Sequence, residues 1–96
     1  MPAFVIYQGE VLDPVRYEAY KAEAAESVRE AGGRYLARGG EVEVLEGEAP
    51  PGRTVVLEFP TRAAAVAWYE GARYTAARAL RQGVARASMY VVDGIG

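Results

Sequence analysis

The chain has 96 residues, of which 51% are apolar and 25% are charged with both signs mixed, so we expect one folded domain over residues 1–96 rather than a disordered chain. The net charge of −2 argues against nucleic acid as the main partner. Cysteine and histidine are both absent, which excludes disulfides and thiolate chemistry and removes the commonest metal and haem ligands, so we expect no metal and no cofactor.

The first elements predicted along the chain are a strand and a helix. Residues 3–11 are rich in β-branched and aromatic side chains, which is typical of a strand. Asp13 is a suitable N-cap for a helix whose first turn accepts Pro14. Apolar side chains then recur at steps of three and four until Gly32, where glycine favours the end of the helix.

Residues 32–40 read GGRYLARGG, a mixture of glycine and arginine that also occurs in phosphate-binding loops. Such a loop precedes a helix and offers the anion its N-terminus, whereas this stretch follows one. The runs 34–38 and 41–46 both resemble strands. We therefore interpret Gly39 and Gly40 as a bulge or tight bend within one long strand.

The second half of the chain supplies a strand, a second helical region and a last strand. Thr61 can cap the helical region, and Gly71 interrupts it. The predicted segments are loop 47–53, strand 54–60, helices 63–70 and 74–82, and strand 88–94. The order β-α-β-β-α-β predicts a ferredoxin-like α+β fold with a four-stranded antiparallel sheet.

Alternation along the strands predicts that both faces of this sheet are apolar. In strand 54–60, Val55 and Leu57 lie on one face, whereas Val56 lies on the other with Glu58. We assign to the face away from the helices the side chains Val5, Tyr7, Val56, Met89 and Val91. A large uncovered apolar face is unusual in a monomer, so we expect a homodimer that packs sheet against sheet.

Glu58 would then lie in the interior of the dimer, where a carboxylate needs a partner. The arginines of the neighbouring strand, Arg34 and Arg38, are the candidates. Two interpretations of Arg38 and Glu58 remain open: a structural ion pair between adjacent strands, or part of a ligand site.

Several of these stretches together resemble a bacterial family catalogued as a domain of unknown function, number 1330. The resemblance runs from about Phe4 to Gly94 and rests on residues 32–40, Leu57-Glu58-Phe59-Pro60, Trp68-Tyr69 followed by Tyr74, and Leu80-Arg81. It implies membership of the dimeric α/β-barrel superfamily, in which two such sheets face one another. That superfamily includes small oxygenases, muconolactone isomerases and haem-dependent enzymes with a histidine ligand, and this chain departs from the last group because it has no histidine.

A ligand site in such a protein is expected between the sheet and the helices. The candidates are Glu58 as a catalytic group and Arg38, Tyr74 and Arg81 as ligand-binding groups. Alternatively, Arg81 is a solvent-exposed charge, or its aliphatic part packs against apolar neighbours. Tyr74 follows the Gly71 break, where the backbone can open the mouth of a pocket. Trp68 and Tyr69 are interpreted as core or interface residues.

Two functions remain open. One is a small cofactor-independent enzyme that acts on an organic acid or aromatic compound, with Glu58 or a tyrosine moving a proton and arginines holding an anion. The other is a non-catalytic dimeric protein that binds a small ligand or is associated with stress. A fully paired Glu58 with no adjacent cavity would favour the second.

No apolar run approaches the roughly 18–20 residues of a membrane helix, and the N-terminus lacks the basic region of a signal peptide. These features and the lack of cysteine predict a cytoplasmic protein with no membrane partner. Arginine outnumbers lysine ten to one and asparagine is absent, which suits a thermophile, although a GC-rich genome produces the same arginine bias.

Overall fold

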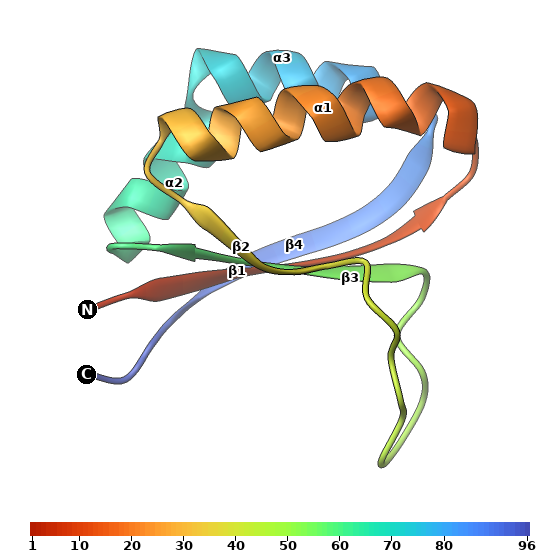
Figure 1. Cartoon of the computed structure of the whole chain (residues 1–96), viewed down its shortest axis with the longest axis horizontal. Helices are drawn as coiled ribbons and strands as arrows, with labels where there is room; N and C mark the ends of the chain where they lie inside the picture. Colours follow the sequence, from red (N-terminus) through yellow and green to blue (C-terminus); the bar gives the residue numbers. More distant parts are fainter.

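Three helices cover one face of a four-stranded sheet in the computed structural model, which describes all of residues 1–96 (Figure 1). In chain order the elements are β1 (Ala3–Val11), α1 (Pro14–Glu30), β2 (Arg34–Arg38), β3 (Arg53–Phe59), α2 (Arg62–Glu70), α3 (Ala72–Arg81) and β4 (Ala85–Asp93). The strands are ordered β2-β3-β1-β4, and all neighbouring pairs are antiparallel. The predicted ferredoxin-like α+β fold is therefore confirmed. None of the helices has the length and apolar character needed to cross a bilayer.

The helix boundaries lie where the capping residues predict them. The Asp13 carboxylate accepts a hydrogen bond from the backbone N–H of Arg16 at 3.1 Å, and the Thr61 hydroxyl accepts one from that of Ala64 at 3.0 Å. Gly32 follows α1 with φ +81°, a conformation that costs glycine little. These local contacts fix the directions in which the helices leave the sheet.

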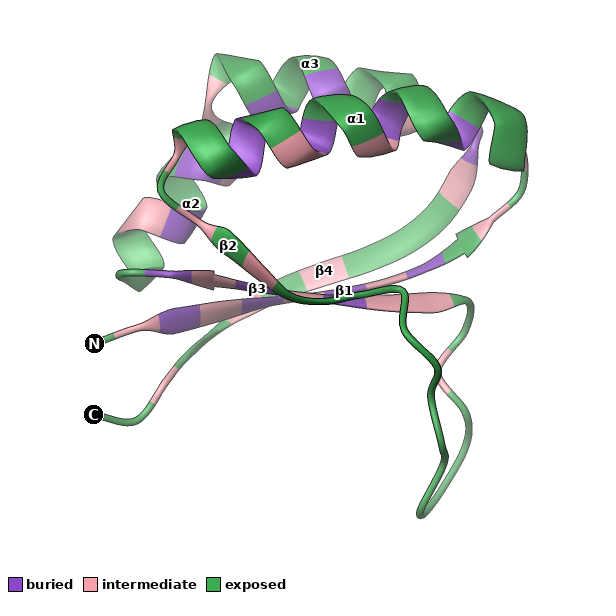
Figure 2. Ribbon diagram, in the orientation of Figure 1, coloured by how far each residue is buried: buried purple, intermediate pink, exposed green.

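The core lies between the helices and the sheet, and its buried residues come mainly from α1, α2, α3, β1 and β3 (Figure 2). Phe59 of β3 and Tyr74 of α3 are fully buried, and Trp68 of α2 packs against both, with ring centroids 5.3 Å and 4.3 Å away. The Trp68 indole N–H donates to the Ser27 hydroxyl at 3.0 Å. An aromatic cluster thus joins all three helices to the sheet.

The assignment of side chains to the two faces of the sheet was wrong for β1 and β4. Val5 and Tyr7 are buried beneath the helices, and Met89 and Val91 pack against the same core. The reason is register, because Val5 pairs with Leu57 whereas Ile6 pairs with Val56. The face without helices, here called the open face, carries the apolar side chains Phe4, Ile6, Val56, Tyr90 and Val92. The prediction of two apolar faces still holds, with different residues.

The long bent strand predicted over residues 34–46 was also wrong. Strand β2 ends at Arg38, and residues 41–46 are exposed and form no strand, because no neighbouring strand pairs with them. The irregularity lies earlier, as a register shift between Tyr35 and Ala37. It lets Arg34 pair with Glu58 and Arg38 pair with Val55, so these two arginines lie on opposite faces.

Gly39 has a positive φ of +72°, as expected for at least one of the two glycines, whereas Gly40 does not. Gly39→Val should therefore lower the free energy of unfolding by about 1 kcal/mol or more, since a β-branched residue tolerates this backbone poorly. Gly40→Val is the matched control, because a Cβ there meets nothing within 4 Å. Urea unfolding of both variants measures the difference, and equal costs would contradict this account.

Candidate functional site

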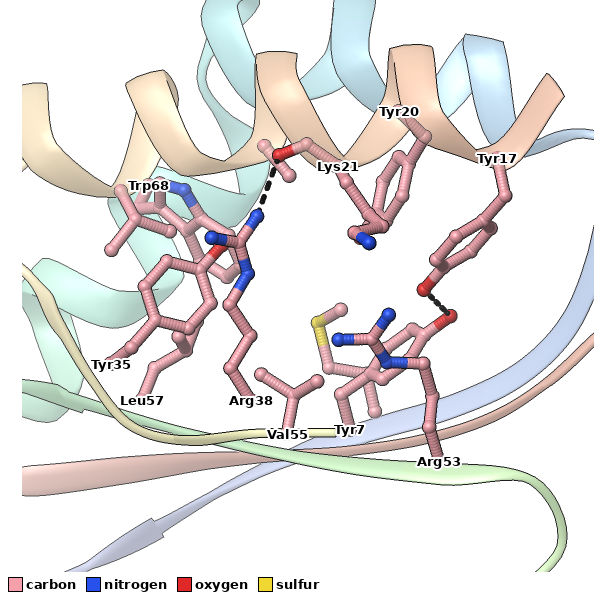
Figure 3. Close-up of a pocket in the computed structure, with 13 residues that line it drawn as sticks. Tyr7, Tyr17, Tyr20, Lys21, Tyr35, Arg38, Arg53, Val55, Leu57 and Trp68 are labelled. Carbon is pink, nitrogen blue, oxygen red and sulfur yellow. Dashed lines mark hydrogen bonds between the residues drawn. The ribbon is translucent and has the colours of Figure 1, made fainter. Parts of the chain in front are cut away.

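A narrow cavity, here called the cleft, lies between α1 and the sheet (Figure 3). It encloses about 30 Å³, room for about one water molecule. Aromatic and cationic side chains reach it from opposite sides, from α1 above and from β1, β2 and β3 below. The phenolic and charged residues of its lining are Tyr7, Tyr17, Tyr20, Lys21, Tyr35, Arg38 and Arg53.

The charged side chains that line the cleft are all cationic, and the Lys21 ammonium is paired with the Glu18 carboxylate, 3.2 Å away. Lys21, Arg38 and Arg53 line it, and no carboxylate does. The Arg53 Nε is buried without a hydrogen-bond partner. Arg38 Nη2 donates to the carbonyl oxygen of Lys21 at 3.1 Å, and its guanidinium lies 4.6 Å from the centre of the Tyr35 ring. A buried donor without a partner is costly, so the cleft favours an anionic acceptor.

Two hydrogen-bonded pairs of phenols lie in and beside the cleft. The hydroxyls of Tyr7 and Tyr17 are 2.9 Å apart, and those of Tyr20 and Tyr74 are 2.8 Å apart. Burial raises the pKa of Tyr17 and Tyr20 well above the ordinary phenol value, and it also raises the pKa of Tyr74. These phenols are neutral at physiological pH, so they can donate hydrogen bonds to an anion but are poorly suited to remove a proton.

Arg81 reaches the same phenols from α3. Its guanidinium lies 5.4 Å from the centre of the Tyr7 ring and 5.3 Å from that of Tyr20, and its Nη1 is buried without a partner. Burial lowers the pKa of Arg81, but the phenols of Tyr74, Tyr20 and Tyr7 together outweigh this effect and hold that pKa above its ordinary value. Arg81 is therefore a fixed positive charge behind the cleft, packed between two rings.

The raised phenol pKa values predict a loss of stability at alkaline pH. Below about pH 10 both the folded and the unfolded chain hold their phenolic protons, so the contribution of these phenols to the free energy of unfolding is fully present. Above it the unfolded chain releases protons that the folded Tyr17, Tyr20 and Tyr74 retain, and the free energy of unfolding falls as pH rises. Urea unfolding between pH 8 and 11 measures the slope, which Tyr20→Phe should flatten. A slope unchanged by that substitution would contradict the assignment.

Three of the four residues predicted for the site lie on the helix side of the sheet. Arg38 lines the cleft, Arg81 lies behind it, and Tyr74 contacts it through Tyr20. Tyr74 is fully buried rather than at the mouth of a pocket, because its ring packs against Trp68 and Tyr20. The sequence therefore identified part of one cluster.

Glu58 lies on the other face of the sheet and does not meet these residues. Its Oε1 is 2.6 Å from Arg34 Nε, so its ion-pair partner is Arg34 and not Arg38. The Glu58 side chain is 24% exposed and borders only a shallow surface hollow that it shares with Arg34. No group of three or more carboxylates is placed to hold a metal ion. Glu58 is thus held in an ion pair with Arg34 on the face away from the cleft, which favours a structural role.

Sequence reasoning did not select six of the phenolic and charged residues of the cleft: Tyr7, Tyr17, Tyr20, Lys21, Tyr35 and Arg53. The tyrosines follow the apolar periodicity of a strand and a helix, and this periodicity alone indicates only burial. The number of tyrosines at inward-facing positions could have indicated a polar cluster in the core, because each buried hydroxyl needs a hydrogen-bond partner.

A second hollow, here called the apolar pocket, lies beneath α2 and beside β1 and β4. Its volume is about 180 Å³, and a cavity of about 150 Å³ can hold benzene. It is lined by Val5, Ala65, Val66, Trp68, Tyr69, Glu70, Met89, Tyr90 and Val91. Trp68 and Met89 also line the cleft, so these two side chains separate the two spaces.

The fold and the cleft define a ferredoxin-like α+β protein with arginines and tyrosines between its sheet and its helices. The chain belongs to the family described as Domain of unknown function (DUF1330), whose model matches residues 2–95. A comparison with curated proteins gives no match.

Solved structures of similar fold include a protein of unknown function from Rhodopseudomonas palustris, with a TM-score of 0.76 and 18% identity over 99% of this chain and 83% of that chain. A putative antibiotic biosynthesis monooxygenase from Nitrosomonas europaea has a TM-score of 0.59 and 22% identity over the full length of both chains. SnoaB, a cofactor-independent oxygenase from Streptomyces nogalater, has a TM-score of 0.64 and 8% identity over 99% of this chain and 94% of that chain. At these identities the likeness shows the fold alone.

Proposed function

We propose that this protein binds a small organic acid in the cleft, through the acid's anionic group. The observation that carries this proposal is that the cleft is lined by Lys21, Arg38 and Arg53 and by no carboxylate. The unpartnered Arg53 Nε supports it, because a carboxylate oxygen is the acceptor that this donor lacks.

The size of the cleft limits which part of the ligand enters it. The space of about 30 Å³ admits about one water-sized group, such as one oxygen of a carboxylate, but not a ring. The rest of the ligand therefore lies at the mouth, where the guanidinium of the exposed Arg38 lies over the half-buried ring of Tyr35. An aromatic acid fits this arrangement, since its ring can stack on this guanidinium while its carboxylate meets Lys21 and Arg53.

A thermal-shift screen of aliphatic and aromatic carboxylic acids tests the proposal. Acids that bind should raise the melting temperature of the wild type. Arg38→Ala should lose that shift while its own stability changes little, because Arg38 is exposed and donates only to the Lys21 carbonyl.

Arg34→Ala is the matched control, because Arg34 lies on the same strand but on the opposite face. It should keep the ligand shift of the wild type. No shift with any acid, or equal loss in both variants, would contradict binding in the cleft.

A second candidate function is that of a small cofactor-independent enzyme acting on an aromatic compound. The apolar pocket favours it, because its volume fits one ring and the carboxylate Glu70 lies at its lining with Tyr69. The cofactor-independent oxygenase among the similar structures adds support at the level of fold. The proton-moving role considered for Glu58 would then pass to Glu70.

Incubation of the protein with a panel of phenols and hydroquinones tests this second function. Oxygen uptake and product formation are the two quantities measured. Turnover that is lost in Glu70→Gln and in Val66→Trp, but kept in Glu58→Gln, would support it. Val66 is 41% exposed, so the larger side chain can narrow the pocket without disturbing the core. Absence of turnover across the panel would leave binding in the cleft as the better account.

We also propose that the chain forms a homodimer through the open face. Its apolar side chains Phe4, Ile6, Val56, Tyr90 and Val92 are only partly covered within one chain. The charged side chains of this face lie next to side chains of opposite charge: Glu58 is paired with Arg34, and Glu10 lies opposite Arg86 on the neighbouring strand. A second copy related by a two-fold axis can therefore cover it without unpaired charge.

A further inference from the structure

The segment between β2 and β3, residues 40–52, forms an arm that leaves the sheet on the side of the open face, away from the helices (Figure 1). None of the chain's backbone–backbone hydrogen bonds involves these residues. Val42, Val44 and Leu45 are 47%, 43% and 89% exposed. The arm thus presents unpaired backbone and apolar side chains on the side where the open face also lacks cover.

The arm has the sequence pattern of a strand. Residues 41–44 read Glu-Val-Glu-Val, an alternation that places the valines on one face and the glutamates on the other. Within one chain no strand lies beside this segment. A segment of this kind becomes a strand when it pairs with a free sheet edge.

We propose that the arm crosses to a second copy of the chain and adds as a strand to the free edge of that copy's β4. This inference rests on the homodimer proposed above. β4 is an edge strand of nine residues, whereas the other edge strand, β2, has five residues and a register shift. Of the two edges, β4 therefore offers the longer and more regular row of unpaired backbone groups.

The side chains on both strands agree with this pairing. Tyr90 and Val92 of β4 face the interior of the proposed dimer. An added arm strand places Val42 and Val44 beside them and turns Glu41 and Glu43 to solvent. Arg86 lies on the same face of β4 as Tyr90 and Val92, opposite Glu10, so Glu41 and Glu43 on the solvent side of the added strand do not contact it.

Reach and area also favour a second copy. The roughly six residues from Gly40 to the tip of the arm extend about 20 Å, whereas facing sheets lie about 10 Å apart. Strands of five to nine residues give the open face a footprint of about 500 Å². Each partner of a stable complex buries about 800 Å². The arm supplies contact that the sheet alone lacks.

Hydrogen–deuterium exchange and sedimentation together test the arm. In the wild type at micromolar concentration, the amides of residues 41–46 should exchange at least about tenfold more slowly than in the Val56→Asp variant, which lacks the dimer. Replacing both Val42 and Val44 with serine should raise the dimer dissociation constant at least about tenfold. Replacing both Glu41 and Glu43 with serine is the matched control and should change it less than about threefold.

Cysteine trapping tests the geometry, since the chain has no cysteine of its own. Val44→Cys combined in turn with Arg86→Cys, Ser88→Cys and Tyr90→Cys, which share one face of the proposed strand pair, should give a covalent dimer of twice the 10.4 kDa chain in at least one pairing. A dimer whose arm amides exchange freely and that never cross-links to β4 would overturn the arm inference and leave the homodimer standing. A chain that stays monomeric would overturn both and leave binding in the cleft untouched.

Discussion

Trp68→Ala should lower the free energy of unfolding by about 3–5 kcal/mol. Trp68 is 6% exposed and packs against Phe59, Tyr69 and Tyr74. The substitution removes the centre of this aromatic cluster and opens a cavity next to the cleft and the apolar pocket. For a domain of this size each kcal/mol shifts the melting temperature by about 4–8 °C. Circular dichroism is the suitable measurement, because Trp68 is the only tryptophan and its fluorescence is lost.

Trp68→Phe separates packing from hydrogen bonding. Phenylalanine keeps much of the ring contact but cannot donate to the Ser27 hydroxyl, which is buried and itself donates to the Ala24 carbonyl. The expected cost is about 1–3 kcal/mol, the range for a buried polar group that loses a partner. If phenylalanine cost as much as alanine, the hydrogen bond and not the packing would dominate.

Val56→Asp should raise the dissociation constant of the proposed homodimer by about a hundredfold or more. Val56 lies in the open face, between Ile6 on β1 and Ala37 on β2. A two-fold interface buries the new carboxylate twice, at about 1.4 kcal/mol or more for each copy, and each such amount corresponds to a factor of ten. Sedimentation equilibrium at micromolar concentration should show twice the chain mass for the wild type and a monomer for the variant.

Glu26→Lys is the control for this experiment, because Glu26 lies on the exposed side of α1. It changes the net charge but leaves the open face intact, so the dimer should persist. A wild type that remains monomeric at this concentration, or a control that dissociates as readily as Val56→Asp, would contradict the open face as the interface.

The element order was predictable because local signals specify it. Asp13 and Thr61 cap helices, Gly71 separates α2 from α3, and the alternation of β3 is regular. Such features depend on a few neighbouring residues and need no knowledge of the tertiary fold. The arm shows the limit of the same reasoning. Its Glu-Val alternation indicates one apolar and one polar side, but a strand also needs a neighbouring strand with which to form hydrogen bonds.

The assignment of faces depended on register, which alternation within one strand does not give. β1 has apolar side chains on both sides, so its sequence does not indicate whether Val5 or Phe4 faces the helices. Only the pairing of Val5 with Leu57 decides between them. The cleft was only partly predictable for a related reason. Its tyrosines come from distant segments, and the contact between Tyr20 and Tyr74 spans 54 positions.

The register shift in β2 identifies a position at which the chain can change length without changing either face of the sheet. Tyr35 pairs with Leu57 and Ala37 pairs with the next residue, Val56, so Leu36 is the extra residue of the strand. Deletion of Leu36 would leave these pairs in place as a regular ladder, with Arg34 still opposite Glu58 and Arg38 still opposite Val55. A gain or loss of one codon at this position can therefore be absorbed by the strand without moving a positive charge from one side of the sheet to the other.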